Sequence, residues 1–95
     1  MGVVKSKAMG QAELLTQMTL CLEKLGVVYA EHFLKGASPG VKSGFCLIEG
    51  ELHFIMDKKK RGREKLRILA LALARLDMDS IHVPPGVRQA IEALW

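Results

Sequence analysis

The dipeptide Glu49-Gly50, placed between two short apolar runs, constrains the fold of this 95-residue chain more than any other feature. If these two residues form a two-residue turn, residues whose numbers add up to 99 face each other on antiparallel strands. One face of the resulting hairpin, over residues 44–58, then carries Phe45, Leu47, Leu52, Phe54 and Met56. The opposite face carries Cys46, Ile48, Glu51, His53 and Ile55. One turn thus sorts both strands into an apolar face and a mixed face, which predicts a hairpin packed against a core on one side.

A further strand is predicted over residues 27–34, where β-branched and aromatic residues lie between Gly26 and Gly36. Small and turn-forming residues fill the stretch 36–44 that follows. We therefore expect the sheet to have three strands, one contributed by residues 27–34 and two by the hairpin.

Three segments have the periodicity of helices. Apolar residues recur at spacings of three and four over 11–25, and Gly26 supplies a stop signal. The segment 63–77 is apolar on more than one side, which predicts a central buried helix; its Leu-Ala alternation also suits a strand, but its length and alanine content favour the helix. A short helix over 85–95 is expected to begin at Pro85.

This order of elements predicts an α+β fold, in which helices pack on one face of a small antiparallel three-stranded sheet. We expect residues 1–9 to be a flexible tail, because they lack a periodic apolar face, and residues 10–95 to form a single globular domain.

Composition excludes several classes of protein. The chain is 49% hydrophobic and 25% charged, and it lacks the run of about eighteen uncharged apolar residues that a membrane span needs. Polar residues interrupt the stretch after Lys5 and Lys7 where a signal peptide would be apolar. Its two cysteines are too few for a disulfide scaffold. We therefore expect a soluble cytoplasmic protein that does not bind membranes.

Positive charge is concentrated in residues 58–67, called the basic segment below. This segment holds seven of the fourteen Lys and Arg residues and one acid, Glu64, so its net charge is +6 within a chain of net charge +4. Cations at the start of a helix oppose the helix dipole, whereas an anion bound there would meet free N–H groups and positive side chains. The candidate residues for binding nucleic acid or another anionic ligand are Lys58, Lys59, Lys60, Arg61 and Arg63. The alternative interpretation is a solvated charged loop.

The predicted register places Cys46 opposite His53, which is half of a metal site or a thiol–imidazole pair. The sequence marks no third group that would complete either site, and it contains no His-Glu-x-x-His motif. A half-buried cross-strand pair without chemistry accounts for both residues, so we expect no metal, no cofactor and no enzymatic activity.

The last helix carries Ile91, Leu94 and Trp95, the only tryptophan. These side chains either close the core or anchor an interface. The leading hypothesis is a non-catalytic module that self-associates or binds a protein partner through its sheet or this helix. The alternative hypothesis is binding of nucleic acid or an anionic ligand through the basic segment.

Overall fold

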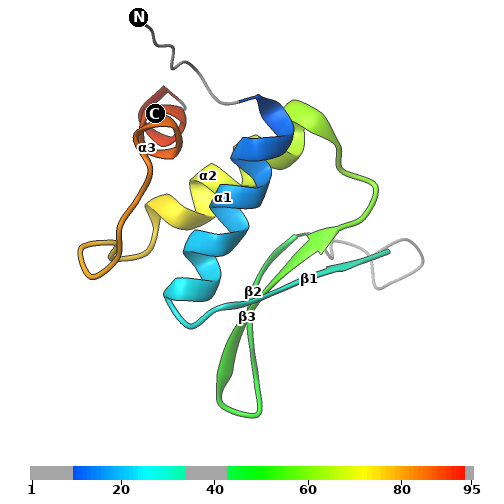
Figure 1. Ribbon diagram of the computed structural model, residues 1–95. Coiled ribbons are helices and arrows are strands. Elements are labelled where there is room, and N and C mark those ends of the chain that lie inside the picture. The colour runs from blue at the N-terminus through cyan, green and yellow to red at the C-terminus, as the bar shows by residue number, and fades with distance from the viewer. Residues whose placement is uncertain (1–9, 34–42, 94–95) are drawn as a thin grey trace, which may run out of the picture.

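A computed structural model describes residues 10–33 and 43–93, which form an α+β fold. Within these residues, three helices pack with a three-stranded mixed sheet (Figure 1). The elements, in chain order, are α1 (Gln11–Lys24), β1 (Val28–His32), β2 (Gly44–Ile48), β3 (Glu51–Asp57), α2 (Gly62–Ala74) and α3 (Pro85–Ala93). The predicted tail 1–9, the end of the predicted strand at Leu34, and the last residues Leu94 and Trp95 lie outside the described residues.

The sheet has the strand order β1-β3-β2, and the prediction of an antiparallel sheet is wrong for β1. This strand runs parallel to β3, with Val28 beside His53 and Ala30 beside Ile55. β1 and β2 do run in opposite directions, but β3 lies between them. β3 is the longest strand and carries two buried side chains, Phe54 and Met56. It occupies the centre of the sheet, where it pairs with a strand along each of its edges.

The hairpin has the register that the sequence predicts. Glu49 and Gly50 both have positive φ, 51° and 84°, which are the values of a type I′ turn. Phe45 therefore lies opposite Phe54, and their rings meet edge to face with centroids 4.9 Å apart. At the open end of the hairpin, the Asp57 N–H donates a 2.8 Å hydrogen bond to Ser43 Oγ.

The helices lie on one side of the sheet, and the core fills the space between them (Figure 1). α1 packs against α2 and β1, while α3 packs against α2 and α1 on the side away from the sheet. The buried hydrophobic residues are Met18, Cys21, Leu22, Val27, Phe54, Met56, Leu69, Ala70, Ala72, Leu73, Val83, Val87 and Ile91. α2 ends at Ala74, before the predicted residue 77, and the Asp79 N–H then bonds to Asp77 Oδ1 in a turn.

The opposite face of the sheet has no helix or strand over it among the described residues. Alternation along the strands gives this face, called the open face below, Val28, Ala30, His32, Cys46, Ile48, Glu51, His53 and Ile55. The end of the β2–β3 hairpin also extends beyond the helices (Figure 1). On the helix side, a cleft of about 180 Å³ separates β2 from α2 at Phe45 and Leu71. β2 is thus less covered than the other strands.

Among the described residues, no helix combines the length and the apolar character needed to cross a membrane.

Candidate functional site

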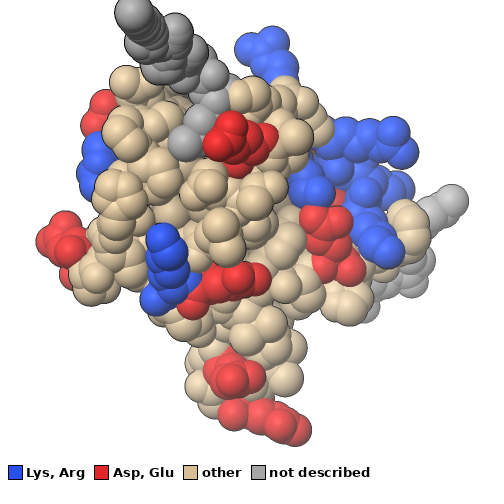
Figure 2. Space-filling view, viewed as in Figure 1, with Lys and Arg blue, Asp and Glu red and all other residues tan. Residues whose placement is uncertain are grey.

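The basic segment forms the connection from β3 to α2 and the first turns of α2. Figure 2 shows its positive side chains gathered on one side of the molecule, next to the end of the sheet. α2 begins after Arg61, whose extended backbone (φ −141°, ψ 157°) suits an N-cap, but no side chain caps the helix. Gly62 has a φ of 51°, and the Gln11 side chain lies 3.2 Å from the position that a Cβ would take. The first turn of α2 therefore lies against the start of α1.

Two of the predicted anion-binding cations, and one further cation of the basic segment, already have partners within the fold or at its surface. The Lys58 ammonium lies 5.2 Å from the centre of the Phe33 ring, a cation–π distance. Lys60 forms an exposed ion pair with Glu64 at 3.2 Å, one helical turn further on. Lys65, also in the basic segment, forms an ion pair with Glu31 on β1. The segment is therefore more than a solvated run of like charges.

Four cations of the basic segment point into solvent: Lys59, Arg61, Arg63 and Arg67. In the part of the chain that the structure describes, no carboxylate lies within ion-pair distance of them. Arg63 and Arg67 also border a cleft of about 200 Å³ whose other lining residues, from α1, α2 and α3, are apolar. These exposed cations give a diffuse positive surface that can attract anions, but no described side chain fixes how an anion would be oriented.

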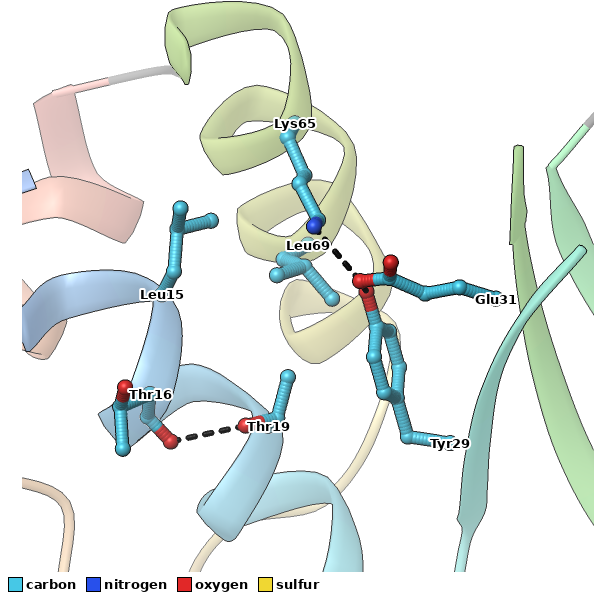
Figure 3. A pocket seen from close by; sticks show the side chains of 7 residues that line it. All are labelled: Leu15, Thr16, Thr19, Tyr29, Glu31, Lys65 and Leu69. Carbon is cyan, nitrogen blue, oxygen red and sulfur yellow. Dashed lines mark hydrogen bonds and ion pairs between the residues drawn. The ribbon is translucent and has the colours of Figure 1, made fainter. Parts of the chain in front are cut away.

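A third cleft, of about 230 Å³, lies between α1, α2 and β1 (Figure 3). In it, Glu31 Oε2 accepts a 2.6 Å hydrogen bond from the Tyr29 hydroxyl and lies 2.6 Å from Lys65 Nζ. The Lys65 ammonium and the Tyr29 hydroxyl lower the pKa of Glu31, against the smaller opposing effect of burial. Burial, and then the hydrogen bond to Glu31, raise the pKa of Tyr29 well above its ordinary value.

This cluster joins β1 to α2 and has little catalytic capacity. Glu31 stays ionised, its Oε2 atom is already bonded to two partners, and Tyr29 stays protonated at neutral pH. The hydroxyls at the rim, on Thr16 and Thr19, donate to carbonyl groups within α1. The arrangement therefore suits a fixed contact between the sheet and α2 better than proton transfer. Sequence analysis missed it, although an acid on the core face of a predicted strand signals a buried cationic partner.

The predicted pairing of Cys46 with His53 is confirmed by the register. Cys46 is exposed, and its strand neighbours supply no further ligand. His53 is 84% buried, and its Nε2 atom, 3.5 Å from Glu51 Oε1, has no hydrogen-bond partner. Over residues 10–33 and 43–93, no three His, Cys, Asp or Glu side chains come together as metal ligands. The pair therefore stands as a cross-strand contact on the open face.

The edge of the sheet at β2 carries two exposed large apolar side chains. Leu47 and Ile48 are 72% and 44% exposed, and the whole strand, Gly-Phe-Cys-Leu-Ile, is uncharged. No other strand of the described residues pairs with its outer edge. In the described part of the last helix, the structure gives no comparable exposed surface to the interface predicted there. Ile91 belongs to the core, and Leu94 and Trp95 lie outside the described residues.

Comparison with protein-family models, with curated proteins and with solved structures found no match to this chain.

Proposed function

We propose that this protein is a non-catalytic interaction module that associates with a second copy of itself through the β2 edge of its sheet. The observation that carries the proposal is this edge, with which no other described strand pairs: β2 is uncharged, and Leu47 and Ile48 are exposed at its end. Unpaired strand edges bind other strands readily, and proteins normally protect them with charged residues, proline or a covering segment. β2 contains neither a charged residue nor proline.

The other free edge of the sheet, on β1, is better protected. β1 contains the charged Glu31 and the exposed His32. Glu31 is also committed to the contact with Lys65, which holds β1 against α2. An incoming strand therefore meets fewer obstacles at β2 than at β1.

The open face has a smaller part in the proposal, because strands that pair edge to edge do not cover it. Val28 is 39% exposed, and it lies in one row across the sheet with His53 and Cys46. Cys46, at the β2 end of this row, is exposed and is the residue of the row that a second copy at the β2 edge would meet.

Sedimentation velocity over a range of protein concentrations tests the proposal. We expect a concentration-dependent dimer, because contact between five-residue strands is smaller than the interfaces of obligate dimers. Ile48→Glu should shift the protein to monomer, since it places a charge at the β2 edge. The matched control is Leu20→Glu on α1, where the leucine is exposed to a similar extent, 38%. The proposal is contradicted if the wild-type protein stays monomeric at concentrations up to about 1 mM. A dimer with a Kd of about 1 mM is held together by only about 4 kcal/mol of binding free energy.

Anion binding is the second candidate function. It is favoured by the exposed Arg61 and Arg63 at the uncapped, positive end of α2. Three other cations of the basic segment already have partners in the structure. Fewer positive charges are therefore available to an anion, which makes anion binding the weaker of the two candidate functions.

A further inference from the structure

We infer that two copies pair through antiparallel β2 strands, with Cys46 on the two-fold axis, to form one continuous six-stranded sheet. This inference rests on the proposed self-association and specifies its geometry. It is carried by three independent features of the hairpin: the direction of its backbone groups, the length of β2 and the distribution of charge along it.

The turn determines which backbone groups of β2 point outwards. In a type I′ hairpin the residues flanking the turn, Ile48 and Glu51, form a hydrogen-bonded pair. Pairs in an antiparallel ladder alternate, so Cys46 and Gly44 also direct their N–H and C=O groups towards β3. Phe45 and Leu47 consequently direct theirs towards the free edge.

A two-fold axis at Cys46 uses all of these outward groups. It places Phe45 of each copy opposite Leu47 of the other, so the two strands share four backbone hydrogen bonds. Because Cys46 is the middle residue of β2, this register overlaps all five residues of the strand. Moving the axis to Phe45 or Leu47 leaves part of each strand unpaired, and we therefore favour the axis at Cys46.

Charge favours the antiparallel orientation and a second copy as the partner. The turn end of the hairpin carries Glu49 and Glu51, whereas the other end leads into Lys58 and Lys59. In the inferred register Glu49 lies beside Ser43 of the second copy. The Oγ atom of that Ser43 accepts a hydrogen bond from the Asp57 N–H of the same copy. The second copy's Lys58 backbone is then about two strand spacings, or about 10 Å, away, slightly further than the backbone of its Asp57. The Lys58 ammonium would have to leave the Phe33 ring to approach Glu49. Parallel pairing of the strands would bring the acidic ends together.

The same arrangement covers Leu47, the most exposed large apolar side chain among the described residues. Directly opposed residues of an antiparallel pair lie on the same face of the sheet, so Leu47 would pack against Phe45 of the second copy. The helices of both copies then lie on one side of the six-stranded sheet. Cys46 and its symmetry mate face each other on the open face as a non-hydrogen-bonded pair, with Cα atoms about 4.5 Å apart. That separation lies within the range that a disulfide can bridge.

Oxidative crosslinking measures this register directly. With copper-phenanthroline as the oxidant, we expect rapid formation of a covalent dimer by the wild-type protein and by Cys21→Ser, because Cys21 is buried. Cys46→Ser should abolish the dimer. To exclude random collision, two further variants are made in the Cys21→Ser/Cys46→Ser background, one with Gly44→Cys and one with Ile48→Cys. Since residues 44 and 48 face each other only between copies, these variants should crosslink several times faster when mixed than when either is alone.

Charge reversal supplies an independent measurement by sedimentation. Glu49→Lys should weaken the dimer, and the double variant Glu49→Lys/Lys58→Glu should restore it. If the wild-type protein dimerises but the mixed cysteine variants crosslink no faster than the separate ones, the register inferred here is wrong and the proposed self-association still stands. If the wild-type protein is monomeric, both are wrong.

Discussion

Lys65 Nζ on α2 lies 2.6 Å from Glu31 Oε2 on β1, and the Tyr29 hydroxyl binds the same carboxylate oxygen. The two charged side chains are only 21% and 30% exposed, so water screens their attraction less than it does for a surface pair. The contact joins the sheet to the helix that follows it and removes one cation of the basic segment from any role in binding a ligand.

Glu31→Gln should destabilise the fold, because it leaves the Lys65 ammonium partly buried beside a neutral amide. We expect the free energy of unfolding to fall by about 1.5–3 kcal/mol, the range for a hydrogen bond to a charged group. Urea denaturation measures the change. The matched control is Glu64→Gln, which breaks the exposed pair with Lys60 and should cost only about 0.3–0.5 kcal/mol. Equal losses in the two variants would show that the Glu31 contact adds nothing beyond a surface ion pair.

The same carboxylate should make stability depend on pH. The folded state lowers the pKa of Glu31 below its ordinary value of 4.5, mainly through the hydrogen bond from Lys65. The resulting stabilisation is fully present above the unfolded pKa and is lost as the pH falls through the folded pKa. Urea denaturation between about pH 7 and pH 3 should therefore show a smaller loss of stability for Glu31→Gln than for the wild-type protein. Parallel profiles for the two proteins would contradict this assignment.

The sequence predicts contacts within the hairpin better than contacts between distant segments. Glu49-Gly50 determines a register by local backbone geometry, so the pairing of Cys46 with His53 followed from the turn alone. The direction of β1 did not follow, because the apolar pattern of Val28–His32 is compatible with a parallel or an antiparallel neighbour. Its direction depends on how β1 packs beside β3 and against α1, which are contacts between segments distant in the sequence.

The contact of Lys65 with Glu31 was missed for a related reason. Lys65 lies in a run of Lys and Arg residues, and nothing in the sequence distinguishes it from its neighbours. Its partner, Glu31, is on a strand far away along the chain. Burial separates the members of the run: Lys65 is partly covered, whereas Arg61 and Arg63 are exposed. Periodicity predicts which face of a helix is apolar, but it does not say which charged residue at the edge of that face will find a partner.

Gly50→Ala should destabilise the hairpin through backbone strain alone. Gly50 has a φ of 84°, and no atom lies within 4 Å of the position that a Cβ would take, so an added methyl group meets no steric clash. The left-handed conformation costs a non-glycine residue about 1–2 kcal/mol, and we expect a loss of stability of that size in urea denaturation. Gly50→Asn is the control, since asparagine tolerates this conformation better and should lose less. If the two variants are equally destabilised, the strain is not the cause.

The exposed cations of the basic segment make a separate prediction about anion binding. If the second candidate function holds, the triple variant Lys59→Ser/Arg61→Ser/Arg63→Ser should lose affinity for mixed-sequence single-stranded RNA and show a shallower dependence of affinity on salt. Each phosphate contact that is lost reduces the slope of log K against log salt by about 0.7 for a single strand. Fluorescence anisotropy at two salt concentrations measures both quantities.

The control for this measurement is Lys24→Ser/Arg75→Ser/Arg88→Ser, which removes the same charge from exposed positions outside the segment. Equal losses in both triple variants would mean that RNA responds to net charge rather than to the end of α2. No binding by the wild-type protein at low salt would exclude the second candidate function. The basic segment would then serve the fold through Lys65 and, in the inferred dimer, face the acidic turn of the second copy through Lys58.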